Sequence, residues 1–143
     1  MRILFWQEPF WPHVGGMAVM AEHLLRAPRD RGHEIAVVTR QDSPELPARV
    51  DWHGIPVHRF PFWRVLDDGD PVEIAALRRE VAALKTSFAP DVVHLSGLGP
   101  SCLFQLQTAP ASPAPMLLTL HSHSTLSSAP TSLARQLLES ADW

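Results

Sequence analysis

Two neighbouring glycines, Gly15 and Gly16, lie where the sequence passes from a short apolar segment into a segment with helical spacing. Glycines in this position let backbone N–H groups approach a phosphate, and the partial positive charge of a helix N-terminus favours an anion there. A lone glycine pair is a weak signal, so on residue types alone a plain turn before a helix is the preferred interpretation. The complete G-x-G-x-x-G pattern of dinucleotide-binding folds is missing, which disfavours NAD binding.

His121 ends a second apolar segment, and a neutral imidazole can donate or accept a hydrogen bond near pH 7. On residue types alone, a partly buried histidine bonded to a loop is the preferred interpretation. His121 and His123 have period-two spacing, which would place both rings on one face of a continuing strand. A zinc site needs three or four ligands, and no Cys, Asp or Glu lies nearby in the sequence, so we expect no metal site.

Aromatic residues crowd the segment that follows the first apolar run. They are Trp6, Phe10 and Trp11, with His13 close behind. Exposed aromatic rings in such a loop could stack on a sugar or on a lipid-like acceptor. A lid of rings packed on the sheet is an equal alternative, and the residue types do not choose between the two.

Two further patterns have simpler explanations than chemistry. Cys102 has no partner motif around it, so we expect a small apolar residue on a helix rather than a nucleophile. The segment 67–70, Asp-Asp-Gly-Asp, lacks the twelve-residue spacing and the closing Glu of a calcium loop. It is therefore expected to be a solvated loop followed by a helix cap.

Alternating strand and helix patterns must position these residues. Short apolar runs predict strands, and helical spacing predicts helices. The strands are expected at 2–6, 34–40, 55–60, 91–96 and 116–121, and the helices at 17–31, 71–87, 101–107 and 132–140. This alternation predicts an α/β fold, a Rossmann-like parallel sheet flanked by helices. Ligands of such sheets bind beyond the carboxyl ends of the strands, here after Trp6, at Ser96 and Gly97, and from His121 onward.

Prolines and caps give local expectations for these elements. Pro28 lies inside the first helix, where it removes a hydrogen bond, and is expected to kink the helix or end it early. Pro56 places its strand near an edge of the sheet. Asp70, Pro71 and Glu73 have the spacing of a capping box with proline at the first helical position.

Length and composition limit the classes of protein. The chain has 143 residues, which suits one domain, and 45% hydrophobic against 19% charged residues exclude a disordered chain. The net charge is −3 and the arginines are interleaved with acids, so nucleic acid is excluded as the main partner. The first apolar run is too short for a signal peptide, and no run approaches the roughly 18 residues of a membrane span. We therefore expect a soluble, cytoplasmic protein.

Four separated segments of the chain resemble family-4-type glycosyltransferases with the GT-B fold, in the order in which that family has them. They are MRILFWQEPFWPHVGGMAVMAEHLLRAPRDRGHEIAVVTR at 1–40, PDVVHL at 90–95, LTLH at 118–121 and ESADW at 139–143. The resemblance is to the N-terminal domain and covers essentially the whole chain. Ser96 departs from the His-Gly pair that many relatives have there, which bears on the type of acceptor more than on family membership.

The resemblance implies the acceptor-binding part of a retaining glycosyltransferase, which moves a sugar from a sugar nucleotide to an acceptor without a metal or another cofactor. It implies that Gly15 and Gly16 approach the phosphate or sugar of the donor, and that His121 contacts the donor sugar in the catalytic site. Acceptor contacts are expected from Trp11, His13, Ser96, Gly97, Ser122 and His123. The expected partners are the sugar nucleotide and an acceptor that is a sugar, a lipid-linked sugar or a small molecule.

The donor-binding domain of that family has no counterpart in residues 1–143, and the resemblance implies that this single Rossmann-like domain stops before its sixth strand. We therefore expect the chain alone to be inactive, and an apolar strand left at the sheet edge to favour self-association into a homo-oligomer. Two alternatives remain open. One is a non-enzymatic binding module that pairs with a separate donor-binding chain. The other is a different nucleotide-binding Rossmann enzyme, which the missing glycine pattern and the absence of an acid at Thr39 and Arg40 weaken.

Overall fold

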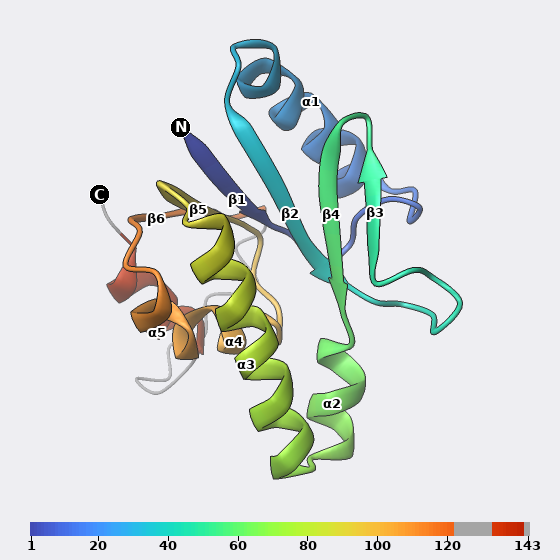
Figure 1. Cartoon of the computed structure of the whole chain (residues 1–143), viewed down its shortest axis with the longest axis vertical. Helices are drawn as coiled ribbons and strands as arrows, with labels where there is room; N and C mark the ends of the chain where they lie inside the picture. The colour runs from blue at the N-terminus through green and yellow to red at the C-terminus, as the bar shows by residue number, and fades with distance from the viewer. Residues whose placement is uncertain (122–132, 142–143) are drawn as a thin grey trace.

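A six-stranded sheet organises the fold in a computed structural model that describes residues 1–121 and 133–141 (Figure 1). Its strands are β1 (Arg2–Trp6), β2 (Glu34–Arg40), β3 (Arg49–Trp52), β4 (Ile55–Phe60), β5 (Val92–Ser96) and β6 (Met116–Thr119). They lie in the order β3-β4-β2-β1-β5-β6, and every neighbouring pair is parallel except β3 and β4. The predicted parallel sheet is confirmed, with one antiparallel strand added at its edge.

Helices cover both faces of this sheet, as the alternation of elements predicts. They are α1 (Gly16–Asp30), α2 (Phe62–Asp68), α3 (Pro71–Phe88), α4 (Cys102–Gln107), the short 3₁₀ helix η1 (Ala109–Ala111) and α5 (Leu133–Ser140). Figure 1 shows α1 separated by the sheet from α3, α4 and α5. The domain therefore has three layers with the sheet in the middle.

Consecutive residues of β1 point into two different cores, one on each face of the sheet. Leu4 and Trp6 pack with residues of α2, α3, α4 and α5, whereas Phe5 packs with Ala21 and Leu25 of α1. All three strand residues are at most 1% exposed. A strand buried on both faces must be apolar at every position, which is why a continuous run in the sequence predicted β1 correctly.

The sequence patterns did not predict two of the elements, β3 and α2. The strand β3 has alternating exposed and half-buried residues and pairs only with β4, through a two-residue turn at His53 and Gly54 with φ values of 52° and 81°. Such turns join antiparallel strands of a hairpin. The helix α2 follows Pro61 and has only seven residues, too few for a clear period.

Only one of the two prolines departs from expectation. The helix α1 runs to Asp30 with Pro28 in its last turn, so the expected early end is wrong. Only one hydrogen bond is lost that close to the end, and the Pro28 carbonyl accepts from the N–H groups of Arg31 and His33 at 3.2 and 3.0 Å. Pro56 lies in β4, which is next to the edge strand β3 and so near the edge as expected, and it precedes the first residue of β4 that pairs with β2.

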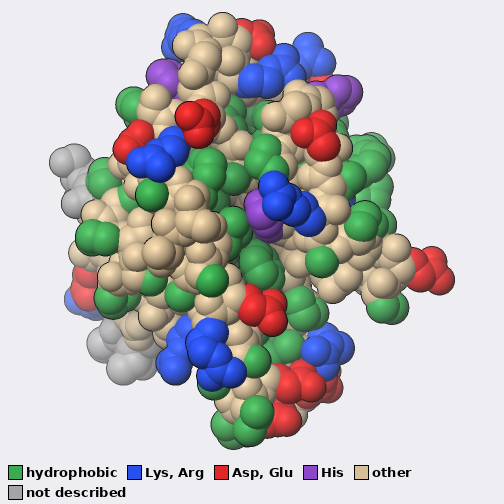
Figure 2. All heavy atoms as spheres, in the orientation of Figure 1, with side chains coloured by type: hydrophobic (Ala, Val, Ile, Leu, Met, Phe, Trp, Pro, Cys, Tyr) green, Lys and Arg blue, Asp and Glu red, His purple; other side chains and the backbone are tan. Residues whose placement is uncertain are grey.

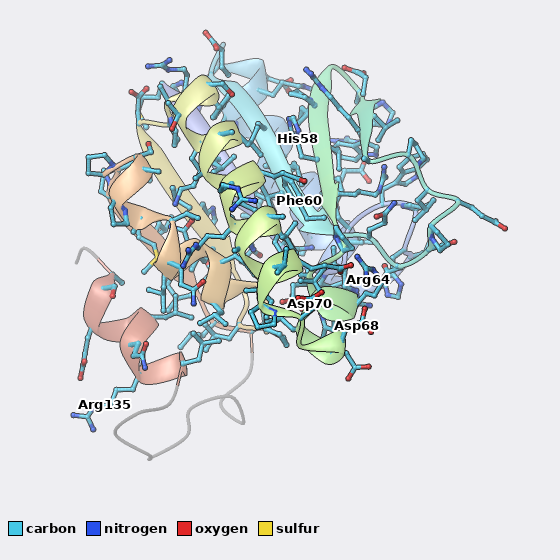
Figure 3. All side chains as sticks on the ribbon, turned by 60° about the horizontal axis from the view of Figure 1, so that its bottom comes forward. His58, Phe60, Arg64, Asp68, Asp70 and Arg135 are labelled. Carbon is cyan, nitrogen blue, oxygen red and sulfur yellow. The ribbon has the colours of Figure 1, made fainter. Side chains whose placement is uncertain are left out.

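The turn between α2 and α3 is a cap and not a metal loop (Figure 3). Gly69 ends α2 in the left-handed region at φ 67°, and the Asp70 carboxylate accepts from the Val72 N–H at 2.8 Å. Glu73 departs from the capping-box expectation, because its carboxylate pairs with Arg64 at 2.8 Å. The predicted helix cap at Asp70 is confirmed, whereas the loop expected from residue 67 is shorter than predicted, because Asp67 and Asp68 still belong to α2.

Charged side chains of both signs are interspersed on the face shown in Figure 2. Three of the ion pairs are between helix residues four positions apart: Glu22–Arg26, Arg64–Asp68 and Arg135–Glu139. Among residues 1–121 and 133–141, none of the helices combines the length and the apolar character that a membrane crossing requires.

Candidate functional site

The carboxyl ends of β1, β5 and β6 meet at one edge of the sheet. Trp6 is paired with Leu95, and Ser96 is paired with Thr119. The residues that follow these strands therefore lie side by side, and the Gly97 N–H donates to the Thr119 carbonyl at 2.8 Å. This is the edge at which ligands of parallel sheets bind.

A chain of three polar side chains crosses this edge. The Ser96 hydroxyl donates to Gln7 Oε1 at 2.8 Å, and Ser96 Oγ lies 3.0 Å from Nε2 of His121. Gln7 and Ser96 are 1% and 2% exposed, whereas His121 is half-buried. The structure therefore brings two predicted site residues, Ser96 and His121, into direct contact, and Ser96 also binds a glutamine that the sequence patterns did not single out.

The backbone at Gly97 is closely packed between these hydrogen-bonded side chains and the start of α1. A Cβ atom at Gly97 would lie 3.1 Å from Met17 Cε and 3.4 Å from His121 Cδ2. Its φ of 92° is also a conformation that side chains rarely adopt. Gly97 thus lets the first turn of α1 and the His121 ring approach each other.

Gly15 and Gly16 form the start of α1, and nothing described around them requires glycine. Gly15 is the N-cap with an extended φ of −172°, which any residue adopts, and no side chain caps the helix. A Cβ at Gly16 would meet no described atom within 4 Å, and one at Gly15 would meet only the His13 ring, at 3.5 Å. The first turn of α1 contains no acidic residue. Within residues 1–121 and 133–141 no side chain caps the N–H groups of this turn, and their partial positive charge favours an anion there.

The aromatic residues of the first loop divide between the two alternatives left open above. Trp6 and Phe10 are 1% and 3% exposed and belong to the cores, while Trp11 is 46% exposed. Trp11 and His13 line a groove of about 280 Å³ whose other walls are Phe10, Val14, Ala18, Val19, Glu22, Trp52 and His53. Packing on the sheet explains the first two rings, and the groove makes Trp11 available for stacking.

A buried arginine holds Trp11 at this groove. Arg59 is 3% exposed, and its Nη2 donates to the Trp11 carbonyl at 2.8 Å while its Nη1 donates to the Pro47 carbonyl at 3.1 Å. The guanidinium lies 5.8 Å from the centre of the Trp11 ring. Burial lowers the pKa of Arg59 and the nearby Asp42 opposes that shift. These contacts fix the position of an otherwise exposed ring.

The predicted site residues thus form two groups rather than one. One group lies on the side of α1 that carries Met17 and consists of Ser96, Gly97 and His121. The other group, Trp11 and His13, lies on another side of the helix, next to Ala18, Val19 and Glu22. Gly15 and Gly16 lie between the groups at the helix start. The predicted acceptor residues Ser122 and His123 lie outside the described residues.

Glu8 is a second site residue that the sequence patterns missed. Its carboxylate accepts from the Ser101 N–H at 2.6 Å and from Nε1 of Trp63 at 2.9 Å. A Cβ at Gly99 would overlap this carboxylate. Glu8 therefore ties the loop after β1 to helix α2 and to the start of α4. Its position two residues after the end of a buried strand is the signal by which it could have been found.

A second histidine lies behind His121. His94 Nε2 is 2.8 Å from the Thr119 hydroxyl, and the ring packs edge-on against Phe5 at 5.1 Å. Burial lowers the pKa of His94, with a smaller contribution from His121. Since burial favours the neutral ring, His94 is a structural histidine of β5.

Cys102 is 2% exposed in α4, and burial raises the pKa of its thiol to about 11. The expected small apolar role is confirmed, because a thiol in that state is protonated at neutral pH.

Within the part of the chain that the structure describes, no three His, Cys, Asp or Glu side chains lie close enough to share a metal ion. Metal-independent transfer stays a prediction.

The fold and this edge define a Rossmann-like α/β domain whose candidate site joins an open helix start to a histidine at the strand ends. The chain belongs to the glycosyl transferase 4-like domain family, which matches residues 15–142. No curated protein matches it. The membership predicted from the four sequence segments is confirmed.

Solved structures show the same fold. The chain is similar to sucrose-phosphate synthase from Thermosynechococcus elongatus, a glycosyltransferase of the GT-B fold, with 16% identity and a TM-score of 0.67 over 96% of this chain. A second structure of sucrose-phosphate synthase from that organism matches 87% of the chain with 13% identity and a TM-score of 0.60. The chain spans 39% of the first of these structures and 65% of the second. The predicted fold, the N-terminal part of a GT-B glycosyltransferase, is confirmed.

Proposed function

We propose that this chain is the acceptor-binding N-terminal part of a retaining glycosyltransferase that moves a sugar from a sugar nucleotide to an acceptor. In this proposal a second domain binds the nucleotide, no metal or other cofactor is needed, and the reaction takes place at the edge formed by Gly15, Gly16, Gly97 and His121. The family and the share of sucrose-phosphate synthase that the chain spans support this division into two domains. A cytoplasmic location is part of the proposal.

The observation that carries the proposal is the helix start at Gly16. Neither a positive φ nor a close described neighbour accounts for glycine at this position. A phosphate or sugar that approaches the backbone N–H groups would account for it, because any side chain there would stand in its path. Met17, the next residue, contacts the Gly97 position beside His121, so a ligand at the helix start would be within reach of the imidazole.

Replacing Gly16 by aspartate is expected to reduce transfer without reducing stability. A carboxylate at a helix N-terminus stabilises by about 0.3–1 kcal/mol, since it opposes the partial positive charge of the helix. The same carboxylate would repel the phosphates of the donor and lower kcat/KM by about tenfold or more. Transfer from a panel of sugar nucleotides is measured with a protein that carries this chain together with a donor-binding domain, and stability is measured by urea unfolding.

The matched control for this experiment is Gly16→Ala, which adds the Cβ without the charge. We expect its kcat/KM to fall less than that of Gly16→Asp. Wild-type transfer by Gly16→Asp would contradict the approach of a phosphate to α1. Robust transfer by the 143-residue chain alone, mixed with sugar nucleotides, would contradict the proposed need for a second domain.

The groove at Trp11 and His13 is the proposed contact surface for the acceptor. It offers one exposed indole ring for stacking and, on its walls, the Glu22 carboxylate and two imidazoles for hydrogen bonds. Sugar rings combine an apolar face with hydroxyl groups and suit such a lining. Ser96, Gly97, Ser122 and His123 complete the proposed acceptor contacts.

Self-association through β6 is the expected behaviour of the isolated chain. The strand pairs with β5 on one side, and Leu117 and Leu120 are 50% and 37% exposed. An exposed apolar strand at an edge pairs readily with a second copy, and a charge on it suppresses pairing. Light scattering at increasing concentration is expected to show a dimer that Leu117→Lys removes and that Val72→Lys, on the exposed face of α3, retains. A wild-type chain that stays monomeric at high concentration would contradict this prediction.

A further inference from the structure

The hydrogen-bond partners of Gln7, Ser96 and His121 determine which of their polar atoms carry protons. The orientation of the Gln7 amide follows from its two acceptors. Its Nε2 donates to the Pro9 carbonyl at 2.7 Å and to the Met17 carbonyl at 3.1 Å. A reversed amide would place its own oxygen against these two acceptors, so the amide nitrogen must face them and Oε1 must face Ser96.

The Ser96 hydroxyl has a single proton. Because Gln7 Oε1 only accepts, Ser96 donates that proton to it, across 2.8 Å. The Ser96 oxygen then meets His121 as an acceptor. His121 Nε2, 3.0 Å away, must therefore carry a hydrogen, and in the neutral ring Nδ1 is left with the lone pair.

Both side chains that impose this arrangement are buried and held by the sheet. Gln7 and Ser96 are 1% and 2% exposed, so water does not compete for their hydrogen bonds. Their meeting follows from the register of β1 against β5, in which Trp6 is opposite Leu95.

We propose that Gln7 and Ser96 are positioning residues that hold His121 as the Nε2–H tautomer, so that Nδ1 accepts a hydrogen bond from a hydroxyl group of a sugar ligand. The identity of the ligand rests on the proposed function, whereas the tautomer does not. An ionised phosphate oxygen is itself an acceptor and does not pair with a neutral Nδ1. The two parts of the site thus bind different groups of the ligand. The start of α1 binds the phosphate, and His121 binds a sugar hydroxyl.

The test is nitrogen-15 NMR of the imidazole groups in the full 143-residue chain at about pH 7.5, where an ordinary histidine is mostly neutral. The signals of His121 are assigned by their loss in His121→Gln. We expect the shift of a protonated nitrogen at Nε2 and that of an unprotonated nitrogen at Nδ1. The reverse assignment, or two averaged shifts from freely exchanging tautomers, would overturn the proposal.

Variants at Ser96 test the positioning role. Ser96→Ala removes the acceptor and is expected to average the two nitrogen shifts, while Ser96→Thr keeps the hydroxyl and is expected to retain the wild-type pattern. Wild-type shifts in Ser96→Ala would show that other groups hold the ring and would overturn the assignment. Backbone amide spectra identify a variant that fails to fold, and the wild-type measurement decides the tautomer without it.

Inorganic phosphate is the probe for the class of ligand. Added to the same sample at about pH 7.5, it is expected to leave Nδ1 unprotonated. Protonation of Nδ1 on adding phosphate would overturn the assignment of a hydroxyl partner. Glycosyl transfer is measured separately. If His121 has the expected tautomer but the protein transfers no sugar, only the proposed function is contradicted. If the protein transfers sugar but His121 has the other tautomer, only this inference is contradicted.

Discussion

Raising the pH from about 7.5 to 10.5 is expected to increase the contribution of Lys85 to the free energy of unfolding by roughly 3 kcal/mol. Lys85 is the only lysine of the chain and is fully buried, at 0% exposed, on the side of α3 that faces α4. Its ammonium donates to Gln105 Oε1 at 2.9 Å and to the Thr108 hydroxyl at 3.2 Å. Its bonds are thus to uncharged groups, and burial lowers its pKa to about 8.

The sign of this effect follows from the two protonation equilibria. Below about pH 8 the lysine is charged in both states, so the folded state bears the full cost of a buried charge. Between about 8 and the ordinary value of 10.5, the folded chain loses the proton and the unfolded chain keeps it. Stability rises with pH wherever the unfolded state binds more protons.

Cys102 has the opposite pH dependence and must be removed from the comparison. Its thiol pKa is raised from 9.0 to about 11 by burial, so the unfolded chain deprotonates first and stability falls as the pH rises through that interval. Urea unfolding is therefore compared between Cys102→Ala and Cys102→Ala with Lys85→Met across the pH range. We expect the rise in stability only in the chain that retains Lys85. Parallel curves for the two chains would contradict the lowered pKa of Lys85.

Replacing Phe62 by alanine is expected to cost about 3–5 kcal/mol of stability, the usual loss for a buried aromatic ring. The side chain is 0% exposed. Its ring centre lies 5.5 Å from that of Trp6, 5.4 Å from that of Phe60 and 5.1 Å from that of Phe104. Phe62 therefore joins β1, β4 and α4, and its removal leaves a cavity that these elements cannot close without moving.

Urea unfolding monitored by circular dichroism measures this loss. Phe62→Leu keeps part of the volume and is expected to lose less, and Val72→Ala, at a residue that is 73% exposed, is expected to change stability by no more than about 0.5 kcal/mol. A loss in Phe62→Ala as small as that of Val72→Ala would show that the aromatic cluster does not hold α2 against the sheet.

Phe62 also marks a limit of prediction from the sequence. The helix α2 that carries it has seven residues, and about two turns after a proline do not produce a recognisable period. Lys85 marks a second limit. The apolar stripe of α3 at Leu77 and Val81 was predicted, yet the next buried position is the lysine, because Gln105 and Thr108 of the facing segment supply its hydrogen bonds. The spacing of apolar residues predicts which face of a helix is buried, but it does not predict which hydrogen-bond partners the facing segment supplies.

The candidate site shows the same division. The sequence by itself determined the strands β1, β2 and β5, because strands buried on both faces must be continuous apolar runs, and it placed Ser96 and His121 at strand ends. Tertiary structure alone decided that Gln7 and Ser96 meet across 89 positions of sequence. The physical reason is that hydrogen bonds between strands fix the register of β1 against β5, and only that register brings the two side chains within bonding distance.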